Sequence, residues 1–120
     1  DTVTSKMTLW VTTQFEGFHK WEQAPDEVAY LRERHRHMFG VRVGVDVHVE
    51  EDRVIEFHML KRVVNEIISQ YVTNGHVEDV GSCEVIAKHI ALRLSCIYGP
   101  GTYHVEVNED GECGASFVTS

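Results

Sequence analysis

The sequence predicts an α+β fold in which an antiparallel sheet is covered on one side by two helices. Valine alternates strictly with polar residues or glycine across 41–49, which is typical of a strand with one buried face. Apolar residues recur three and four positions apart across 58–72, which is typical of an amphipathic helix. Strand patterns precede and follow the helical region, and this order indicates an α+β arrangement.

Length and composition are those of one globular domain, residues 1–120, with a polar tail at 1–6. Of the 120 residues, 42% are hydrophobic and 25% are charged, and no repeat or linker interrupts them. The formal net charge of -8 argues against nucleic acid or an anionic membrane as a partner. No apolar run is long enough to span a bilayer, and no charged-then-apolar leader opens the chain.

Cysteine usage predicts a reducing, cytoplasmic setting. The chain has three cysteines, Cys83, Cys96 and Cys113, an odd number at wide spacing without a CxxC pair. This pattern predicts neither a disulfide framework nor a cysteine-based zinc site, and it favours a reducing compartment. We expect all three to be small buried residues rather than nucleophiles.

The first half of the chain predicts three strands. Residues 8–17 form the first, with one apolar face made by Leu9, Val11 and Phe15. Residues 18–30 predict a loop with a short helical turn. The alternating stretch predicts a second strand over 36–50, followed by a turn at 50–53. A short third strand, RVIEF at 53–57, is expected to form a hairpin with the second.

The second half predicts two helices. The first covers 58–72, and a loop follows at 73–82. Ser82 is a plausible N-cap for a second helix over 83–97. The residues expected to face inward on that helix are Val85, Ile86, Ile90, Leu94 and Ile97.

Two further strands, 102–109 and 114–119, are predicted after the helices. Tyr103, Val105 and Val107 form the inward face of the first of them, and Glu109 extends that face. A carboxylate in line with core residues needs a partner, because burying it alone is costly. Glu109 therefore either accepts hydrogen bonds from a ligand with adjacent N–H donors or lies in solvent just past the strand end.

Two histidines share the buried face of the second strand. The alternation continues backwards from the valines through Phe39 to His37 and His35. Residues two apart on a strand lie roughly 7 Å apart on one face, which lets two imidazoles converge on one ion. His19 follows the first strand with the inward parity. Three neutral histidines and an open fourth position describe a catalytic zinc ion, although a His-x-His pair also occurs as ordinary surface or core histidines.

Five short motifs follow one another along nearly the whole chain, from Leu9 to Phe117. They read FEGFH (15–19), HRHMFGVRV (35–43), EFHMLK (56–61), GSCE (81–84) and VEVNED (105–110). In this order they resemble the motifs of the 6-pyruvoyl-tetrahydropterin synthase family, which includes the 6-carboxy-tetrahydropterin synthases. The corresponding family patterns are Phe-x-Ala-x-His, HGH, Asp-Phe-x-x-Leu-Lys, Pro-Thr-Ser-Glu and Val-x-Val-x-Glu-Thr.

The resemblance implies a T-fold, a four-stranded antiparallel sheet with two helices on one face. Subunits of that fold join their sheets into a barrel, as trimers or hexamers, with active sites at subunit boundaries. Exposed sheet edges in a lone subunit fit that need for partners. The resemblance also implies a set of site residues: zinc on His19, His35 and His37, and a pterin-like ring on Glu109 with Ser82 and Cys83 nearby.

The chain departs from the family at two positions. Leu31 stands where the family has its nucleophilic cysteine, four residues before the first histidine of HGH. The Asp-His pair after the first helix is absent, although His76 lies nearby, out of register. Some relatives replace the cysteine by glutamate, so Glu33, which shares the parity of His35, is the candidate base. Alternatively, Glu33 is a surface carboxylate between two arginines.

The resemblance therefore implies a zinc-dependent lyase that abstracts a proton from a pterin-type substrate and then eliminates or cleaves its side chain. Glu33 and His76 are its candidate catalytic residues. Two alternatives remain open. One is a zinc enzyme of the same fold with aldol, epimerase or cyclase chemistry on a non-pterin compound. The other is a non-catalytic module that binds a pterin.

Overall fold

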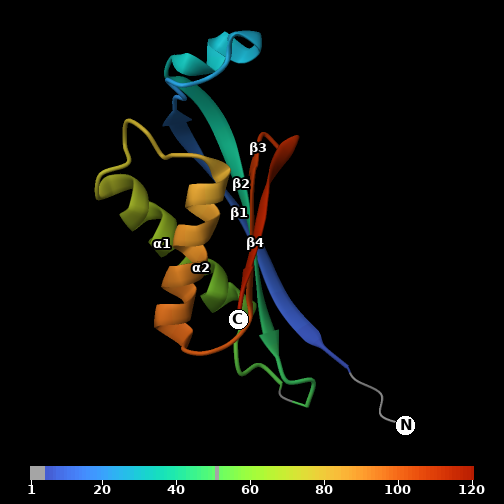
Figure 1. Cartoon of the computed structure of the whole chain (residues 1–120). Helices are drawn as coiled ribbons and strands as arrows, with labels where there is room; N and C mark the ends of the chain where they lie inside the picture. The colour runs from blue at the N-terminus through green and yellow to red at the C-terminus, as the bar shows by residue number, and fades with distance from the viewer. Residues whose placement is uncertain (1–4, 51) are drawn as a thin grey trace.

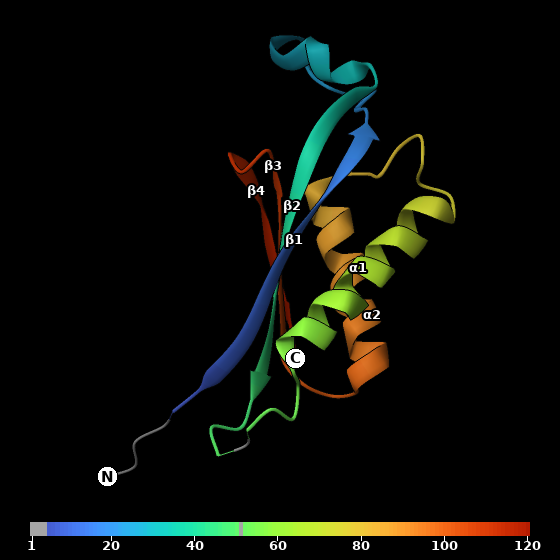
Figure 2. The ribbon, with the colours of Figure 1, turned by 180° about the vertical axis from the view of Figure 1, so that it is seen from behind.

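The computed structural model describes residues 5–50 and 52–120 and confirms the α+β prediction. One four-stranded antiparallel sheet is covered on one face by two helices, as Figures 1 and 2 show from opposite sides. The predicted tail at 1–6 lies outside the described residues except for its last two. The elements in chain order are β1 (Met7–His19), the 3₁₀ helix η1 (Asp26–Arg32), β2 (His35–Val47), α1 (Phe57–Thr73), α2 (Cys83–Tyr98), β3 (Tyr103–Glu109) and β4 (Cys113–Thr119).

The two longest strands, β1 and β2, pair over their whole length, from Met7 opposite Val47 to His19 opposite His35. β3 pairs with the other side of β2, and β4 pairs with β3, so the spatial order is β1-β2-β3-β4. The inward parity read from the sequence is the face that packs under the helices. Its most deeply buried members are Phe39, Val41, Val43, Val45, Tyr103, Val105 and Val107.

Both helices begin at side-chain caps. The Glu56 carboxylate accepts hydrogen bonds from the N–H groups of His58 and Met59 at the start of α1. The Ser82 hydroxyl accepts from the N–H of Val85 at 3.1 Å, which confirms the predicted cap of α2. Such a cap satisfies backbone donors that have no partner inside the helix.

The inward face of α2 differs from the prediction at two positions. Val85 and Ile97 were expected to face inward, but their residues are 52% and 47% exposed. The small residues Ala87 and Ala91 are fully buried instead. Alanines leave room for the helix to approach its neighbours closely, and the two larger side chains then lie on the outer flank.

The predicted strand at 53–57 is wrong. Residues 52–55 form bends, and Phe57 is already the first residue of α1. Arg53 has a φ of 58°, a left-handed conformation that interrupts an extended backbone. β1 pairs with β2 over its whole length and β3 pairs with it from Phe39 to Val45, so most of β2 already has a partner on both sides. The sheet therefore has the four strands that the family resemblance implied, without the additional strand that the pattern at 53–57 predicted.

The two outer strands, β1 and β4, each pair on one side only in the part of the chain that the structure describes. β1 is 13 residues long and β4 is 7. A long unpaired edge presents a row of backbone donors and acceptors to another chain. Among residues 5–50 and 52–120, no helix has the length and apolarity needed to cross a membrane.

Candidate metal centre

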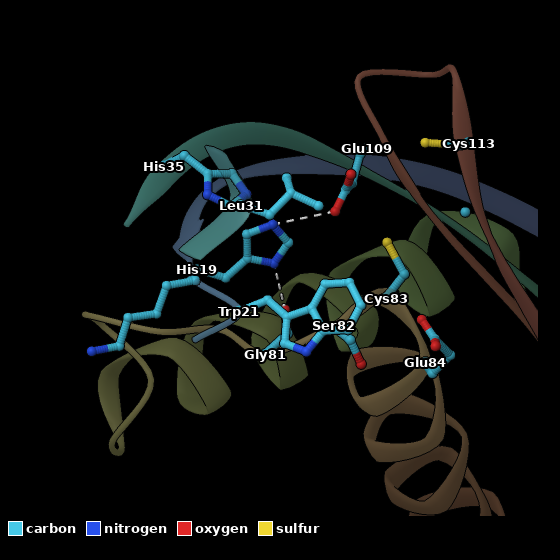
Figure 3. Close-up of a pocket in the computed structure, with 12 residues that line it drawn as sticks. His19, Trp21, Leu31, His35, Gly81, Ser82, Cys83, Glu84, Glu109 and Cys113 are labelled. Atoms are coloured by element: carbon cyan, nitrogen blue, oxygen red, sulfur yellow. Dashed lines mark hydrogen bonds and ion pairs between the residues drawn. The ribbon is translucent and has the colours of Figure 1, made fainter. Parts of the chain in front are cut away.

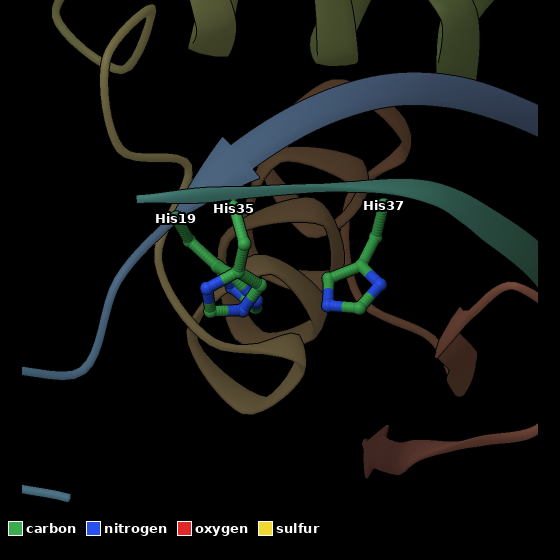
Figure 4. Close-up of side chains that lie close together, drawn as sticks. All are labelled: His19, His35 and His37. Carbon is green, nitrogen blue, oxygen red and sulfur yellow. The ribbon is translucent and has the colours of Figure 1, made fainter. Parts of the chain in front are cut away.

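The three predicted histidines come together at one end of the sheet. One ring nitrogen from each of His19, His35 and His37 lies within 4.8 Å of the others. Figure 4 shows the three side chains on the same side of the two strands. His19 ends β1 and is paired directly with His35, the first residue of β2. His37 is two residues further along the same face. The sequence prediction that these three side chains converge is therefore confirmed.

The outer nitrogen of each ring is held by an oxygen atom. His19 Nδ1 lies 2.8 Å from the Gly81 carbonyl oxygen, and His35 Nδ1 lies 2.8 Å from the carbonyl oxygen of Glu33. His37 Nδ1 lies 2.7 Å from Asp110 Oδ2. Carbonyl and carboxylate oxygens only accept hydrogen bonds, so each Nδ1 carries the ring proton. Each Nε2 is then left with a lone pair, which is the form that binds a metal ion.

The Nε2 atoms of the three rings lie on the inner side of the cluster, where those of His19 and His37 are close to the carboxylate of Glu109. His35 Nε2 and His37 Nε2 are buried and have no hydrogen-bond partner among the described residues. Glu109 places one carboxylate oxygen 3.3 Å from His19 Nε2 and the other 3.7 Å from His37 Nε2. Lone pairs and a carboxylate directed at one another are unfavourable without a cation between them. The donor set therefore fits a divalent metal ion.

Phe39 forms an apolar floor under the cluster. Its ring lies edge-on to His19 and His37, with ring centroids 5.3 and 5.9 Å apart. Phe39 is fully buried and stacks on Phe15 at 5.2 Å. A Cβ atom at Gly17, opposite His37, would lie 2.9 Å from the Phe39 ring, so the glycine allows this close packing. The packing restricts rotation of the imidazoles and excludes water from beneath them.

Asp110 was not predicted as a site residue. It follows β3 with a φ of 57°, and its other oxygen, Oδ1, accepts from the Met38 N–H at 2.9 Å. The hydrogen bond from His37, and then that from Met38, hold the pKa of Asp110 below its ordinary value. The aspartate is visible in the sequence, but its contact with His37 follows from the β2–β3 register, which periodicity alone does not give.

A cavity of about 550 Å³ opens beside the histidines, between the end of the sheet and the start of α2 (Figure 3). Glu109, Ser82 and Cys83, the predicted substrate-binding residues, all line it. His19 and His35 form one wall. The lining residues that the sequence analysis missed include Lys20, Trp21 and Glu84. The carboxylates and the indole give the cavity hydrogen-bond acceptors and an aromatic face.

The thiol of Cys83 is a neutral group in this cavity. Burial, and after it the negative charges of Glu109 and Glu84, raise its pKa to about 12. A thiol protonated at neutral pH is a poor nucleophile and a poor metal ligand. Cys83 is buried as predicted, but Cys96 and Cys113 are exposed, so the expectation that all three cysteines are buried is wrong.

The two predicted catalytic residues lie apart from the cavity lining. Glu33 follows η1, just before β2 begins, and is exposed; its carbonyl group, not its carboxylate, contacts His35. His76 stacks on Tyr71 with ring centroids 4.0 Å apart and lines a separate cavity with His89. The catalytic roles of Glu33 and His76 stay predictions.

Comparisons with known proteins add no relative. No protein-family model matches the chain, and no curated protein matches it. The resemblance to the tetrahydropterin synthases therefore depends on the five motifs, and the other evidence for function is the geometry of the site.

We expect the metal-free protein to take up one divalent transition-metal ion per chain, and His35→Ala to weaken that binding by more than about 100-fold. Loss of a group that only orients a ligand already costs about 10–100-fold. Competition with a chromophoric chelator measures the affinity. His48→Ala, at an exposed histidine outside the cluster, is the control. Equal metal affinity in the His35→Ala and His48→Ala variants would show that the His35 ring is not a metal ligand.

Proposed function

We propose that the chain is a zinc-dependent enzyme of the 6-pyruvoyl- or 6-carboxy-tetrahydropterin synthase type, acting on a pterin-like substrate. The observation that carries the proposal is the convergence of three imidazoles, each oriented through Nδ1, at the wall of a cavity. The order of the five sequence motifs supports the same family.

Zinc is the proposed ion because three neutral nitrogen ligands with one further position are typical of catalytic zinc sites. A bound zinc ion supplies Lewis acidity toward an oxygen of the substrate side chain. The remaining work falls to residues of the chain. Phe39 keeps the inner side of the cluster dry, and Glu109 contributes a negative charge beside the ligands. Both features strengthen electrostatic interactions with a cation.

The cavity supports recognition of a flat ring with neighbouring N–H donors. The two oxygens of Glu109 are acceptors at its inner end, and the side chain is 26% exposed. Trp21 lines the outer part and offers an aromatic surface for stacking. Ser82 uses its oxygen to cap α2, which leaves its hydroxyl proton free to donate.

Glu109→Ala is expected to weaken binding of a pterin such as neopterin by at least about 10-fold, because a charge-assisted hydrogen-bond acceptor contributes about 1.5–3 kcal/mol. Calorimetry on zinc-loaded protein measures the binding, with zinc content determined on the same sample. Glu106→Ala is the matched control, because Glu106 lies on the same strand and is exposed on the opposite face. Pterin binding that survives Glu109→Ala would favour a non-pterin substrate.

Glu33 remains the proposed proton acceptor. Its carboxylate is outside the cavity lining of the single chain, whereas Glu84 and Glu109 are within it. We expect Glu33→Gln to lower turnover at least about 100-fold with zinc retained, since general-base catalysis contributes 10²–10⁴-fold. Turnover assays with Glu33→Gln and Glu84→Gln, side by side, measure this. Loss of turnover in Glu84→Gln alone would assign the base to Glu84.

Leu31 favours a second candidate function, a non-catalytic module that binds a metal ion and a pterin. This leucine lines the cavity at the position where the resembled family has its nucleophilic cysteine. An alkyl group cannot move a proton, so the cavity has binding groups but lacks that part of the proton relay. Tight pterin binding by zinc-loaded protein, without turnover of any dihydropterin substrate, would select this function over the enzyme.

We further propose that the chain assembles as a T-fold barrel of trimers or hexamers, in which β1 of one subunit pairs with β4 of the next. The unpaired edges of both strands support this proposal. Native mass spectrometry is expected to show a trimer or hexamer. Hydrogen exchange is expected to show protected amides along β4, although many of its residues are exposed in the single chain. A monomer with rapidly exchanging β4 amides would contradict the assembly.

A further inference from the structure

We propose that Asp110 is a positioning residue that fixes the tautomer of His37 and thereby prepares its Nε2 for the metal ion. The inference rests on the metal site of the proposed function. Asp110 is not one of the three proposed ligands. Its role predicts the tautomer of His37 in the metal-free protein, which can be measured without an activity assay.

The contacts of Asp110 form a closed local arrangement. Its Oδ2 lies 2.7 Å from His37 Nδ1, and its Oδ1 accepts from the Met38 N–H at 2.9 Å. The Asp110 N–H in turn donates to the Met38 carbonyl at 2.8 Å. Two hydrogen bonds to neighbouring residues of β2 hold the carboxylate in one orientation. One oxygen is therefore directed at the outer nitrogen of His37, on the side away from the cluster.

Asp110 differs from the partners of the other two ligands. His19 and His35 donate to the backbone carbonyls of Gly81 and Glu33, which no substitution removes. Among the described residues, Asp110 is the one side chain that holds Nδ1 of a cluster histidine. A carboxylate in this position fixes the ring orientation and makes the ligand nitrogen more basic, as carboxylate–histidine pairs do at zinc sites.

Asparagine at this position separates an orienting role from a structural one. It retains an oxygen for the Met38 N–H and tolerates the left-handed backbone of residue 110. Its amide group, however, then faces His37 with an N–H donor. His37 can keep this hydrogen bond only by accepting at Nδ1, which moves its own proton to Nε2, where the metal ion must bind. Asp110→Asn thus preserves the turn but stabilises the wrong tautomer.

The test compares Asp110→Asn with the parent protein. Long-range ¹H–¹⁵N spectra of the metal-free proteins report the tautomer of His37, and chelator competition reports zinc affinity. We expect protonated Nδ1 in the parent protein and protonated Nε2 in the variant. Zinc affinity should fall about 10–100-fold, the range for loss of an orienting partner. The melting temperature of the metal-free protein should change little. If Asp110 had only a structural role, weaker zinc binding would be accompanied by a lower melting temperature.

Asp46→Asn is the matched control, because Asp46 pairs with His104 at 2.8 Å on the other face of the sheet. It should leave zinc affinity unchanged. If Asp110→Asn does not fold, Asp110→Gly removes the carboxylate while tolerating the positive φ, and it should also bind zinc more weakly. An unchanged tautomer, or unchanged zinc affinity in both Asp110 variants, overturns the inference. Failure of the parent protein to bind zinc overturns the proposed function instead.

Discussion

The register of β1 on β2 is the constraint on which the site depends. It places His19 opposite His35 and Gly17 opposite His37, all on the face that packs under the helices. A slip of one residue would reverse the face of every side chain on one strand and separate the imidazoles. The valines further along β2 fix this register, because their burial in the core requires the same parity. Core packing and the geometry of the histidine cluster are thus set by one alignment.

The helical layer contributes to the site through the segment before α2, in which Asp79, Val80 and Gly81 are consecutive. The Val80 N–H donates to the Phe18 carbonyl at 2.8 Å, and the Val80 carbonyl accepts from the Tyr71 hydroxyl at 2.8 Å. Gly81 then offers its carbonyl to His19, while its N–H is held by the Asp79 carboxylate at 2.8 Å. The segment therefore joins β1, α1 and the first histidine of the cluster in one set of hydrogen bonds.

Periodicity was sufficient to predict the sheet face and the two helices. It placed the three histidines in phase but left open whether they form a site, and the family resemblance added the expectation that they converge. Periodicity failed where a contact depends on how strands are ordered in space. The short strand at 53–57 has the right residue types, but Arg53 adopts a left-handed backbone and most of β2 is already paired on both sides. Asp110 reaches His37 because β3 ends beside the start of β2, a juxtaposition of residues 73 positions apart. Glu33 shares the parity of His35, but it precedes the strand, so its alternation predicts no direction for the side chain.

The link between Gly81 and His19 has a thermodynamic consequence under the proposed function. An ion held by His19 also secures the carbonyl group that precedes α2, so metal occupancy and docking of the helical layer are coupled equilibria. Ligands that bind only the folded chain stabilise it by mass action, in proportion to the logarithm of their free concentration. Scarcity of the ion would then lower the amount of folded protein in the cell through degradation, as well as the fraction of it that is active.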